Sequence, residues 1–318
     1  MMRYLARRAA LAVVVALMVL VALASLARVL PGDAATAILG QRATPELVAL
    51  VREEMGLNES VPAQVGGFVF DAVQGDLGED FFTRRPVTEI VFEALPHTVA
   101  LAIASMLLAT LVAIPLGVLA ATRPGSALDR VLATTSIVAI SIPSLVAGLG
   151  LLVVFGVQFE LFPIIGTGSF SDPLDYLHHL VLPSVAIALA WTGYLARLLR
   201  ASLVEELGAT YIRAATAYGV DNRVIFYRYA LKNAFIPTLA VVGFAVAALM
   251  GGALFVEVIF SRQGVGTALA YAISTRNYVV VQGIVAVVAV LFILTNLLVD
   301  LAYRFIDPRV RVEDAPSQ

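Results

Sequence analysis

Long uncharged apolar runs alternate with shorter charged segments along the whole chain. A helix needs roughly 20 apolar residues to cross the hydrocarbon core of a bilayer. Six runs come close to this length or exceed it, so the pattern predicts an all-α polytopic membrane protein with six transmembrane helices. The six runs are 9–27, 98–122, 131–159, 180–196, 234–256 and 279–299.

Two of these runs have features that complicate the count. Pro143 lies inside the third run, and we expect this span to end near Phe155. A proline kink within the span is tolerated, because neighbouring helices in a bundle can satisfy the freed carbonyl. The first run follows Arg3, Arg7 and Arg8, and it is followed by Ser-Leu-Ala at 25–27. An alternative interpretation of this first run is therefore a secretory signal peptide.

The basic residues predict the orientation of the spans. If each run crosses once, 14 of the 21 basic residues fall on one side, which the positive-inside rule assigns to the cytoplasm. Six crossings then place both termini in the cytoplasm. The basic residues that define this side are Arg3, Arg7, Arg8, Arg123, Arg130, Arg197, Arg200, Arg213, Arg223, Arg228, Lys232, Arg304, Arg309 and Arg311.

The segment 31–97 is too long for a simple turn between two spans. Within it, Thr44 suits a helix N-cap, Pro45 suits the first helical position and Gly56 suits the C-terminal end. We therefore expect a small external subdomain. The predicted organisation is 1–30 for the N-terminal tail and first span, 31–97 for the subdomain, 98–306 for the five-span permease core and 307–318 for a cytoplasmic tail.

Composition narrows the class of protein and removes several kinds of chemistry. The chain is 60% hydrophobic and 14% charged, against about 25% charged residues in an average soluble domain. It has no cysteine, which excludes disulfides, thiolate metal sites and cysteine nucleophiles. A phosphate-binding loop of the Walker A type needs Gly-Lys-Ser/Thr, but Lys232 is the single lysine and lies between Leu231 and Asn233. The net charge of −2 indicates no particular partner.

Residues 211–237, YIRAATAYGVDNRVIFYRYALKNAFIP, form a charged stretch between two apolar runs. Apolar and small residues recur at helical spacing over 202–218, Gly219 interrupts the pattern, and a second helix is predicted over 222–236, ending at Pro237. The mixture of tyrosines and arginines is typical of a contact surface. The alternative is an ordinary solvated loop.

This stretch resembles the EAA loop of ABC-importer membrane subunits, in which Glu-Ala-Ala is followed by three residues, Gly, nine residues and Ile-x-Leu-Pro. Ala214–Ala215, Gly219 and Leu231 match this pattern, whereas Arg213, Tyr229 and Lys232 depart from it. YIRAATAYGV followed by Lys-Asn is similar to the form found in the first permease subunit of dipeptide and oligopeptide importers. Four further stretches resemble that family at matching places: LPGD (30–33), GDLGEDFFTRRPVTEIVFEALPHT (75–98), SIPS (141–144) and NLLVDLAYRFIDPRVR (296–311).

The resemblance implies a transport subunit of a bacterial cell membrane rather than an enzyme. It implies half of a translocation pathway, a homologous second permease subunit, two cytoplasmic ATPase subunits that bind ATP and Mg²⁺, and an external substrate-binding protein; no nucleic acid is implied. The coupling loop would be 201–236, and its helix would sit on an ATPase. The residues expected to contact the ATPase are Tyr211, Arg213, Ala214, Ala215, Tyr218, Gly219, Arg223, Leu231 and Lys232. Peptides are the expected substrate, and nickel chelates, glutathione and sugars are alternatives within the same family.

A second group of residues is a candidate for the pathway or its gate. It consists of Ser141, Pro143, Ser144, Trp191, Tyr194 and Glu257. Core packing is an alternative role for the two aromatic residues, and Glu257 could instead be a carboxylate at headgroup level at the outer end of its span. The adjacent pair His178 and His179 suggests no metal site, because neighbouring side chains diverge on a regular element.

Two other classes of protein remain as alternatives. A secondary transporter or channel working without ATP would carry charged residues in mid-span, whereas the six runs have none at their centres. A scaffold or an intramembrane enzyme is the other class, but the chain contains no His-Glu-x-x-His and no Gly-x-Ser-x-Gly motif.

Overall fold

The computed structural model describes residues 14–15, 17–22, 24–25, 36, 39, 43–54 and 58–306. These residues are almost entirely helical; they form no strand, and a single isolated bridge pairs Glu79 with Pro86. The predicted all-α class is confirmed. Nine of the 19 residues of the first predicted span, 9–27, and the whole tail 307–318 lie outside the described residues.

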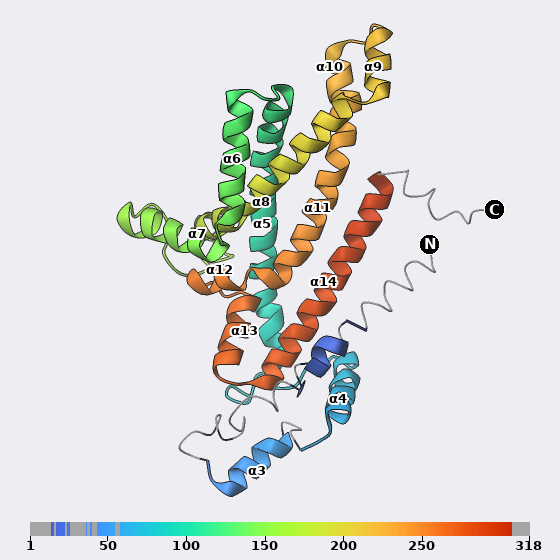
Figure 1. Ribbon diagram of the computed structural model, residues 1–318. Helices are drawn as coiled ribbons and strands as arrows, with labels where there is room; N and C mark the ends of the chain where they lie inside the picture. Colours follow the sequence, from blue (N-terminus) through green and yellow to red (C-terminus); the bar gives the residue numbers. More distant parts are fainter. Residues whose placement is uncertain are drawn as a thin grey trace, which may run out of the picture. The chain divides into compact units, whose positions relative to one another are not determined.

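The chain divides into two compact units (Figure 1). Unit one comprises Met1–Thr98 and Gln263–Ile293, and unit two comprises Val99–Arg262 and Leu294–Gln318. The long helices α5 (Val87–Thr122) and α14 (Tyr278–Ile306) each contribute residues to both units.

Unit one contains short helices around a small apolar core. Its complete helices are α3 (Pro45–Glu54), α4 (Val61–Val73) and α13 (Val265–Ser274). As predicted, Thr44 precedes α3, and its hydroxyl accepts a hydrogen bond from the amide of Leu47 at 3.3 Å. The core is formed by Leu77, Val87, Val91, Ala94, Val265, Ala272, Val280, Val281 and Ile284.

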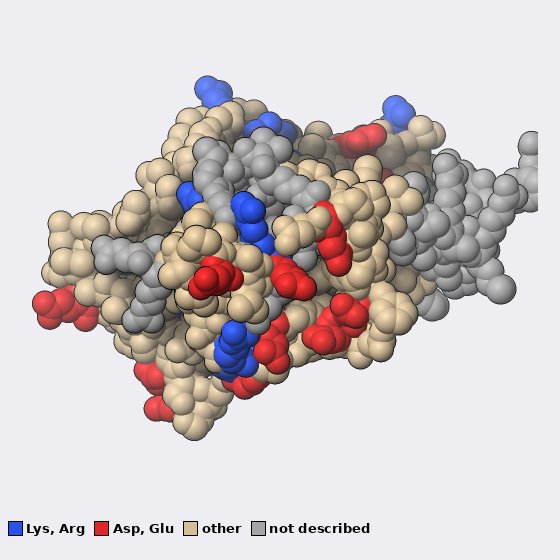
Figure 2. Space-filling model, turned by 90° about the horizontal axis from the view of Figure 1, so that it is seen from below, with Lys and Arg blue, Asp and Glu red and all other residues tan. Residues whose placement is uncertain are grey.

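Unit one presents an acidic surface between residues 43 and 98. Figure 2 shows a face of the molecule on which acidic side chains outnumber basic ones. The exposed acidic residues of this segment are Glu46, Glu53, Glu59, Asp71, Asp76, Glu79, Glu89 and Glu93, and its exposed basic residues are Arg52 and Arg84. In contrast to these exposed residues, Asp80 is buried in the loop before α5. The side-chain amide of Asn277 donates a 2.6 Å hydrogen bond to the Asp80 carboxylate and so fixes this loop.

Unit two contains the remaining helices. They are α6 (Ala127–Ser141), α7 (Ser144–Leu151), the π-helix η2 (Leu152–Gln158), α8 (Pro173–Leu207), α9 (Thr210–Ala217), α10 (Asn222–Val224), the π-helix η3 (Ile225–Ala230), α11 (Leu231–Gly252) and α12 (Leu254–Ile259). Side chains cap the N-termini of three of them: Ser126 accepts from the Asp129 amide at α6, Asp172 from the Leu174 amide at α8, and Asp221 from the Arg223 amide at α10.

Four helices of the described chain are long and apolar enough to cross a membrane, and a bent pair could form a fifth span. The four are Val87–Thr122, Pro173–Leu207, Asn222–Leu249 and Tyr278–Val299. The bent pair is Ala127–Ser141 with Ser144–Gln158, whose axes differ by 97°. This pair covers the predicted third run, 131–159, and the bend falls at Pro143, where a kink was expected, because Pro143 has no amide hydrogen to continue the helical hydrogen bonds.

Two predicted helix boundaries near the charged stretch are wrong. Helix 202–218 is interrupted at Gly208 and Ala209, where α8 ends and α9 begins. The helix beginning at Asn222 does not end at Pro237; Pro237 lies inside α11, and the helical chain continues to Gly252. A proline within a membrane helix is tolerated because neighbours can satisfy the freed carbonyl.

The main core of unit two joins α5, α8, α11 and α12. Leu101, Leu195 and Phe260 are among its fully buried side chains. Small residues let the helices approach closely: a Cβ built on Gly193 of α8 would lie 2.7 Å from the Ser136 carbonyl of α6.

Candidate functional site

The helix α9 lies with α10 at the end of α8 and α11 (Figure 1). The amide of Gly208 closes α8 by donating to the carbonyls of Val204 and Glu205, and the amide of Ala209 donates to the Glu206 carbonyl. Ala209 then adopts an extended conformation, with φ −68° and ψ 150°, and α9 starts in a new direction. The predicted coupling segment is therefore a separate short helix between two long apolar helices.

A single fully apolar anchor holds α9 against the rest of unit two. Ile212 is 5% exposed and belongs to a buried cluster with Leu203 of α8 and Ala234 of α11. Ala215, one helical turn further on, packs partly buried against the same cluster. Burial of these side chains couples the position of α9 to both long helices.

The opposite face of α9 is exposed. Tyr218 is 88% exposed and Tyr211 is 40% exposed, and Arg213, Ala214 and Ala217 are exposed beside them. Tyrosine and arginine around small residues are the composition of protein contact surfaces. Of the residues predicted for ATPase contact, this face displays Tyr211, Arg213, Ala214 and Tyr218, whereas Ala215 points partly into the core.

The turn after α9 depends on Gly219. Gly219 has φ +78°, and the amide of the next residue, Val220, donates to the Ala215 carbonyl at 3.1 Å. No atom lies within 4 Å of a Cβ built at this glycine, so a side chain would meet no steric clash. Glycine is favoured here because of the left-handed backbone conformation. Asp221 then caps the following helix by accepting from the Arg223 amide at 2.7 Å.

Polar contacts connect α9 to its flanking helices. The Tyr211 hydroxyl donates to the Glu206 carboxylate at the end of α8. The same hydroxyl accepts a 3.1 Å hydrogen bond from the Asn233 amide of α11. Nearby, Leu231 packs against the buried cluster while Lys232 and Arg223 remain exposed. Tyr211 therefore contacts both helices that lead away from the segment.

The residues predicted for a pathway or gate occupy three places in unit two. Ser141, Pro143 and Ser144 form the corner between α6 and α7, and the Ser141 hydroxyl is bonded to the Ile137 carbonyl at 2.8 Å. Trp191 and Tyr194 meet edge to face on α8, with ring centroids 6.1 Å apart. Trp191 packs against the main core, and Tyr194 is 46% exposed.

Glu257 is the third place. It lies on α12 with 0% exposure. Five residues later Arg262 is also 0% exposed, and its amide donates to the Glu257 carbonyl at 2.8 Å. Ser261 between them has φ +47°, so this short segment folds back sharply.

The buried Arg262 guanidinium is held by the N-terminal part of α8. One nitrogen donates to the His179 carbonyl at 3.2 Å and another to the Tyr176 hydroxyl at 3.4 Å, and the group lies 5.6 Å from the Tyr176 ring centre. Burial lowers the pKa of Arg262, while Tyr176 and the Glu257 carboxylate act in the opposite direction. The charges thus compensate each other inside the protein.

Sequence reasoning missed Arg262 and a second ion pair in unit two. Arg200 of α8 binds Asp129 of α6 through two hydrogen bonds of 2.5 and 2.7 Å. Asp129 also accepts from the Gly125 amide at 2.8 Å, which ties the loop before α6 to α8. The available signal was weak: these charges lie two to six residues from the nearest uncharged run.

The arrangement around α9 is suited to contact with another protein. Within the described residues, no group of three His, Asp or Glu side chains is placed to hold a metal ion. Polar side chains on α9 are exposed, whereas the buried Arg262 guanidinium beside α12 donates within the chain to the His179 carbonyl and the Tyr176 hydroxyl.

Comparisons with known proteins place the chain in a family. The profile of the binding-protein-dependent transport system inner membrane component matches residues 113–312, and the N-terminal profile of the same systems matches residues 1–102. The chain is 37% identical to the "Probable peptide ABC transporter permease protein y4tP" of Sinorhizobium fredii, over 97% of this chain and 99% of that protein. It is 35% identical to the "Dipeptide transport system permease protein DppB" of Alkalihalophilus pseudofirmus, over 98% and 100%.

A solved structure supports the fold. The structure titled "Crystal structure of an amino acid ABC transporter with histidines" aligns with a TM-score of 0.53 and 16% identity. The alignment covers 70% of this chain and 94% of that one. At this identity the likeness concerns the fold alone.

The chain belongs to the family of binding-protein-dependent transport system inner membrane components. The predicted resemblance to ABC-importer permeases is confirmed. It is therefore a multi-pass inner-membrane component of an ABC transporter, and such a system also contains a substrate-binding protein and an ATPase.

Proposed function

We propose that this chain forms half of the translocation pathway of a peptide importer and that α9 is seated on a cytoplasmic ATPase subunit. The observation that carries the proposal is the geometry of α9, which buries Ile212 against two long helices and presents Tyr211, Arg213 and Tyr218 outward. A short helix fixed in this way can pass a displacement on as a rigid element.

The energy would come from two ATPase subunits that bind ATP and Mg²⁺, since the chain has no Walker A motif. ATP binding would close the ATPase pair, and α9 would carry that motion into α8 and α11. A homologous second permease subunit would complete the pathway, and an external binding protein would deliver the substrate. Di- or oligopeptides are the proposed substrate because the relatives named above are peptide and dipeptide permeases.

The orientation belongs to the same proposal: the segment 201–236 and both termini face the cytoplasm. The basic residues at this end of unit two support it through the positive-inside rule. Because the chain has no cysteine, single cysteines at Ser60 and Arg228 can be labelled selectively in intact cells. An impermeant maleimide should label Ser60→Cys and leave Arg228→Cys unlabelled; the reverse pattern contradicts the orientation.

Two variants of Gly219 test the coupling role. Valine resists the left-handed conformation, whereas asparagine accepts it more readily. Gly219→Val should abolish substrate-stimulated ATP hydrolysis and peptide uptake while the assembly keeps its membrane level, and Gly219→Asn should retain most of both. Normal uptake by Gly219→Val at a normal membrane level contradicts the coupling role.

The substrate class is tested separately with the complete assembly in proteoliposomes. Uptake of a labelled dipeptide or oligopeptide is expected, with its matched binding protein present. Glutathione, a nickel chelate and a sugar serve as competitors. Uptake of one of these with no uptake of peptides contradicts the peptide assignment and leaves the coupling role standing.

A further inference from the structure

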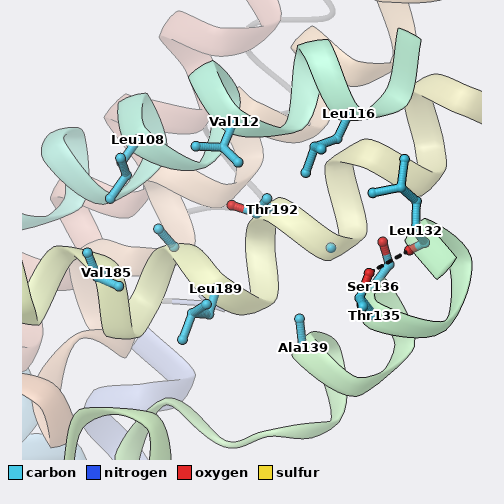
Figure 3. A pocket seen from close by; sticks show the side chains of 12 residues that line it. Leu108, Val112, Leu116, Leu132, Thr135, Ser136, Ala139, Val185, Leu189 and Thr192 are labelled. Atoms are coloured by element: carbon cyan, nitrogen blue, oxygen red, sulfur yellow. Dashed lines mark hydrogen bonds between the residues drawn. The ribbon is translucent and has the colours of Figure 1, made fainter. Parts of the chain in front are cut away.

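An open apolar groove runs between three helices of unit two (Figure 3). Its volume is about 380 Å³. Side chains from α5, α6 and α8 converge on it, and its lining contains no charged residue. Residues that project into it include Leu108, Val112 and Leu116 of α5, Leu132 and Ala139 of α6, and Leu189 of α8.

One end of the groove is basic. A small recess shares Leu116, Leu132 and Ser136 with the groove and adds the two side chains of Arg197 and Arg200. Arg200 is already paired with a carboxylate, as described above. Arg197 is exposed, and its side chain makes no ion pair or hydrogen bond with another described residue.

The basic end lies where the apolar part of each helix stops. Arg197 directly follows the uncharged run 180–196 of α8, and Arg123 directly follows the uncharged run 98–122 of α5. Arg130 precedes the uncharged run that includes most of α6. Arginines at such boundaries lie at the level of the lipid headgroups.

The lining is poorly suited to a peptide or other polar cargo. Three hydroxyl-bearing residues line the groove, Thr135, Ser136 and Thr192, among nine apolar or glycine residues. The Thr135 hydroxyl is already bonded to the carbonyls of Val131 and Leu132 at 2.9 and 3.2 Å. A polar ligand would therefore lose hydrogen bonds to water on entry and recover few. An apolar chain entering from the bilayer loses none.

We propose that the groove and the recess together bind an anionic glycerophospholipid. One acyl chain lies along the apolar groove, and the phosphate is held by the guanidinium of Arg197. Basic pockets between membrane helices on the cytoplasmic side favour anionic headgroups, and the planar donor fork of arginine suits a phosphate. The proposal requires that the chain spans a membrane and is independent of the transported substrate.

Native mass spectrometry of the intact purified assembly tests this proposal. The probes are phosphatidylglycerol, cardiolipin and, as the zwitterionic control, phosphatidylethanolamine. We expect the two anionic lipids to bind more tightly than phosphatidylethanolamine, and their ratio shows which one fits the groove. Arg197→Gln should weaken the anionic lipid about fivefold, as one lost arginine at a lipid surface implies. Arg228 lines neither the groove nor the recess, so Arg228→Gln should leave lipid binding unchanged.

A second pair of variants tests the apolar part of the site. Ala139→Phe should fill the groove and remove the bound lipid, whereas Val138→Phe, on the exposed side of α6, should not. If Ala139→Phe does not assemble, the arginine pair decides the question alone. Equal binding of all three lipids, or equal effects of Arg197→Gln and Arg228→Gln, overturns the proposal. Cross-linking of Thr135→Cys to a second permease subunit also overturns it, because a protein helix would then occupy the groove.

Discussion

Two segments of unit two interrupt long apolar helices, and they treat their charged residues in opposite ways. Around α9, Arg213, Arg223 and Lys232 are exposed. On and just beyond α12, Glu257 and Arg262 both have 0% exposure. Both segments are short and both contain a residue with positive φ. The two segments differ in what surrounds their charged groups: solvent around α9, and other residues of the chain around Glu257 and Arg262.

This difference indicates that α9 is a surface for a partner, whereas the buried Glu257 and Arg262 form an internal brace, a pair of opposite charges that stabilises unit two. An exposed guanidinium keeps its water and is available to another protein at little cost. A buried cation must be compensated within the chain, because desolvation without a partner costs several kcal/mol. We therefore expect α9 changes to affect docking and α12 changes to affect the integrity of unit two. Four variants test this contrast, in order of decreasing effect on stability.

The largest effect is expected from Glu257→Ala. Removing the carboxylate leaves Arg262 buried without its opposite charge, which should lower the free energy of unfolding by about 3–5 kcal/mol. Thermal and denaturant unfolding of the purified protein in detergent measure this loss. The double variant Glu257→Ala/Arg262→Met should recover much of it, because no buried charge remains. A single variant as stable as the wild type contradicts the brace.

Ile212→Ala should have the next largest effect. Its side chain anchors α9, and truncation leaves a cavity that costs about 2–4 kcal/mol. We also expect loss of ATPase coupling, because α9 is no longer fixed to α8 and α11. Val224→Ala is the control, since Val224 is 40% exposed. Equal stability of the two variants in detergent contradicts the anchoring role.

Asp221→Ala should have a smaller effect, confined to the start of the helix after Gly219. The Asp221 side chain caps that helix, and loss of such a cap costs about 1 kcal/mol. Amide hydrogen exchange should rise locally at residues 222–225. Asp221→Asn retains a capping oxygen and should exchange like the wild type. Faster exchange in the asparagine variant assigns the effect to charge and contradicts the capping account.

Tyr218→Ala should leave stability unchanged within about 0.5 kcal/mol, because the side chain is 88% exposed. Its effect should instead appear in docking, where loss of an aromatic hot spot costs about 2 kcal/mol or more. Co-purification of the ATPase subunits measures that loss, and Tyr227→Ala, at 66% exposure, is the matched control. If Tyr218→Ala co-purifies as much ATPase as the wild type does, Tyr218 is not a contact residue.

The sequence predicted the helical class and the helix start at Thr44, because these depend on local chemistry. A long apolar run has few alternatives to a helix in a bilayer, and Thr44-Pro45 suits a helix start in any context. The glycine before the second helix was predicted for the same reason, since Gly219 separates two helical patterns. The break at Gly208 was missed and the size of the bend at Pro143 was not predicted, because hydropathy shows the length of a run but not its direction.

Whether a charge faces solvent or a partner inside the chain was decided by tertiary structure alone. Glu257 and Arg262 are five residues apart, yet the hydrogen-bond partners of the buried Arg262 guanidinium are Tyr176 and His179, more than eighty positions earlier. Asp129 and Arg200 likewise meet only because α6 packs on α8. The sequence by itself determined that the chain crosses a membrane and carries its exposed charge between two helices. The sequence did not show which charges are paired. Pairing depends on burial, and burial depends on neighbours that come from distant segments of the chain.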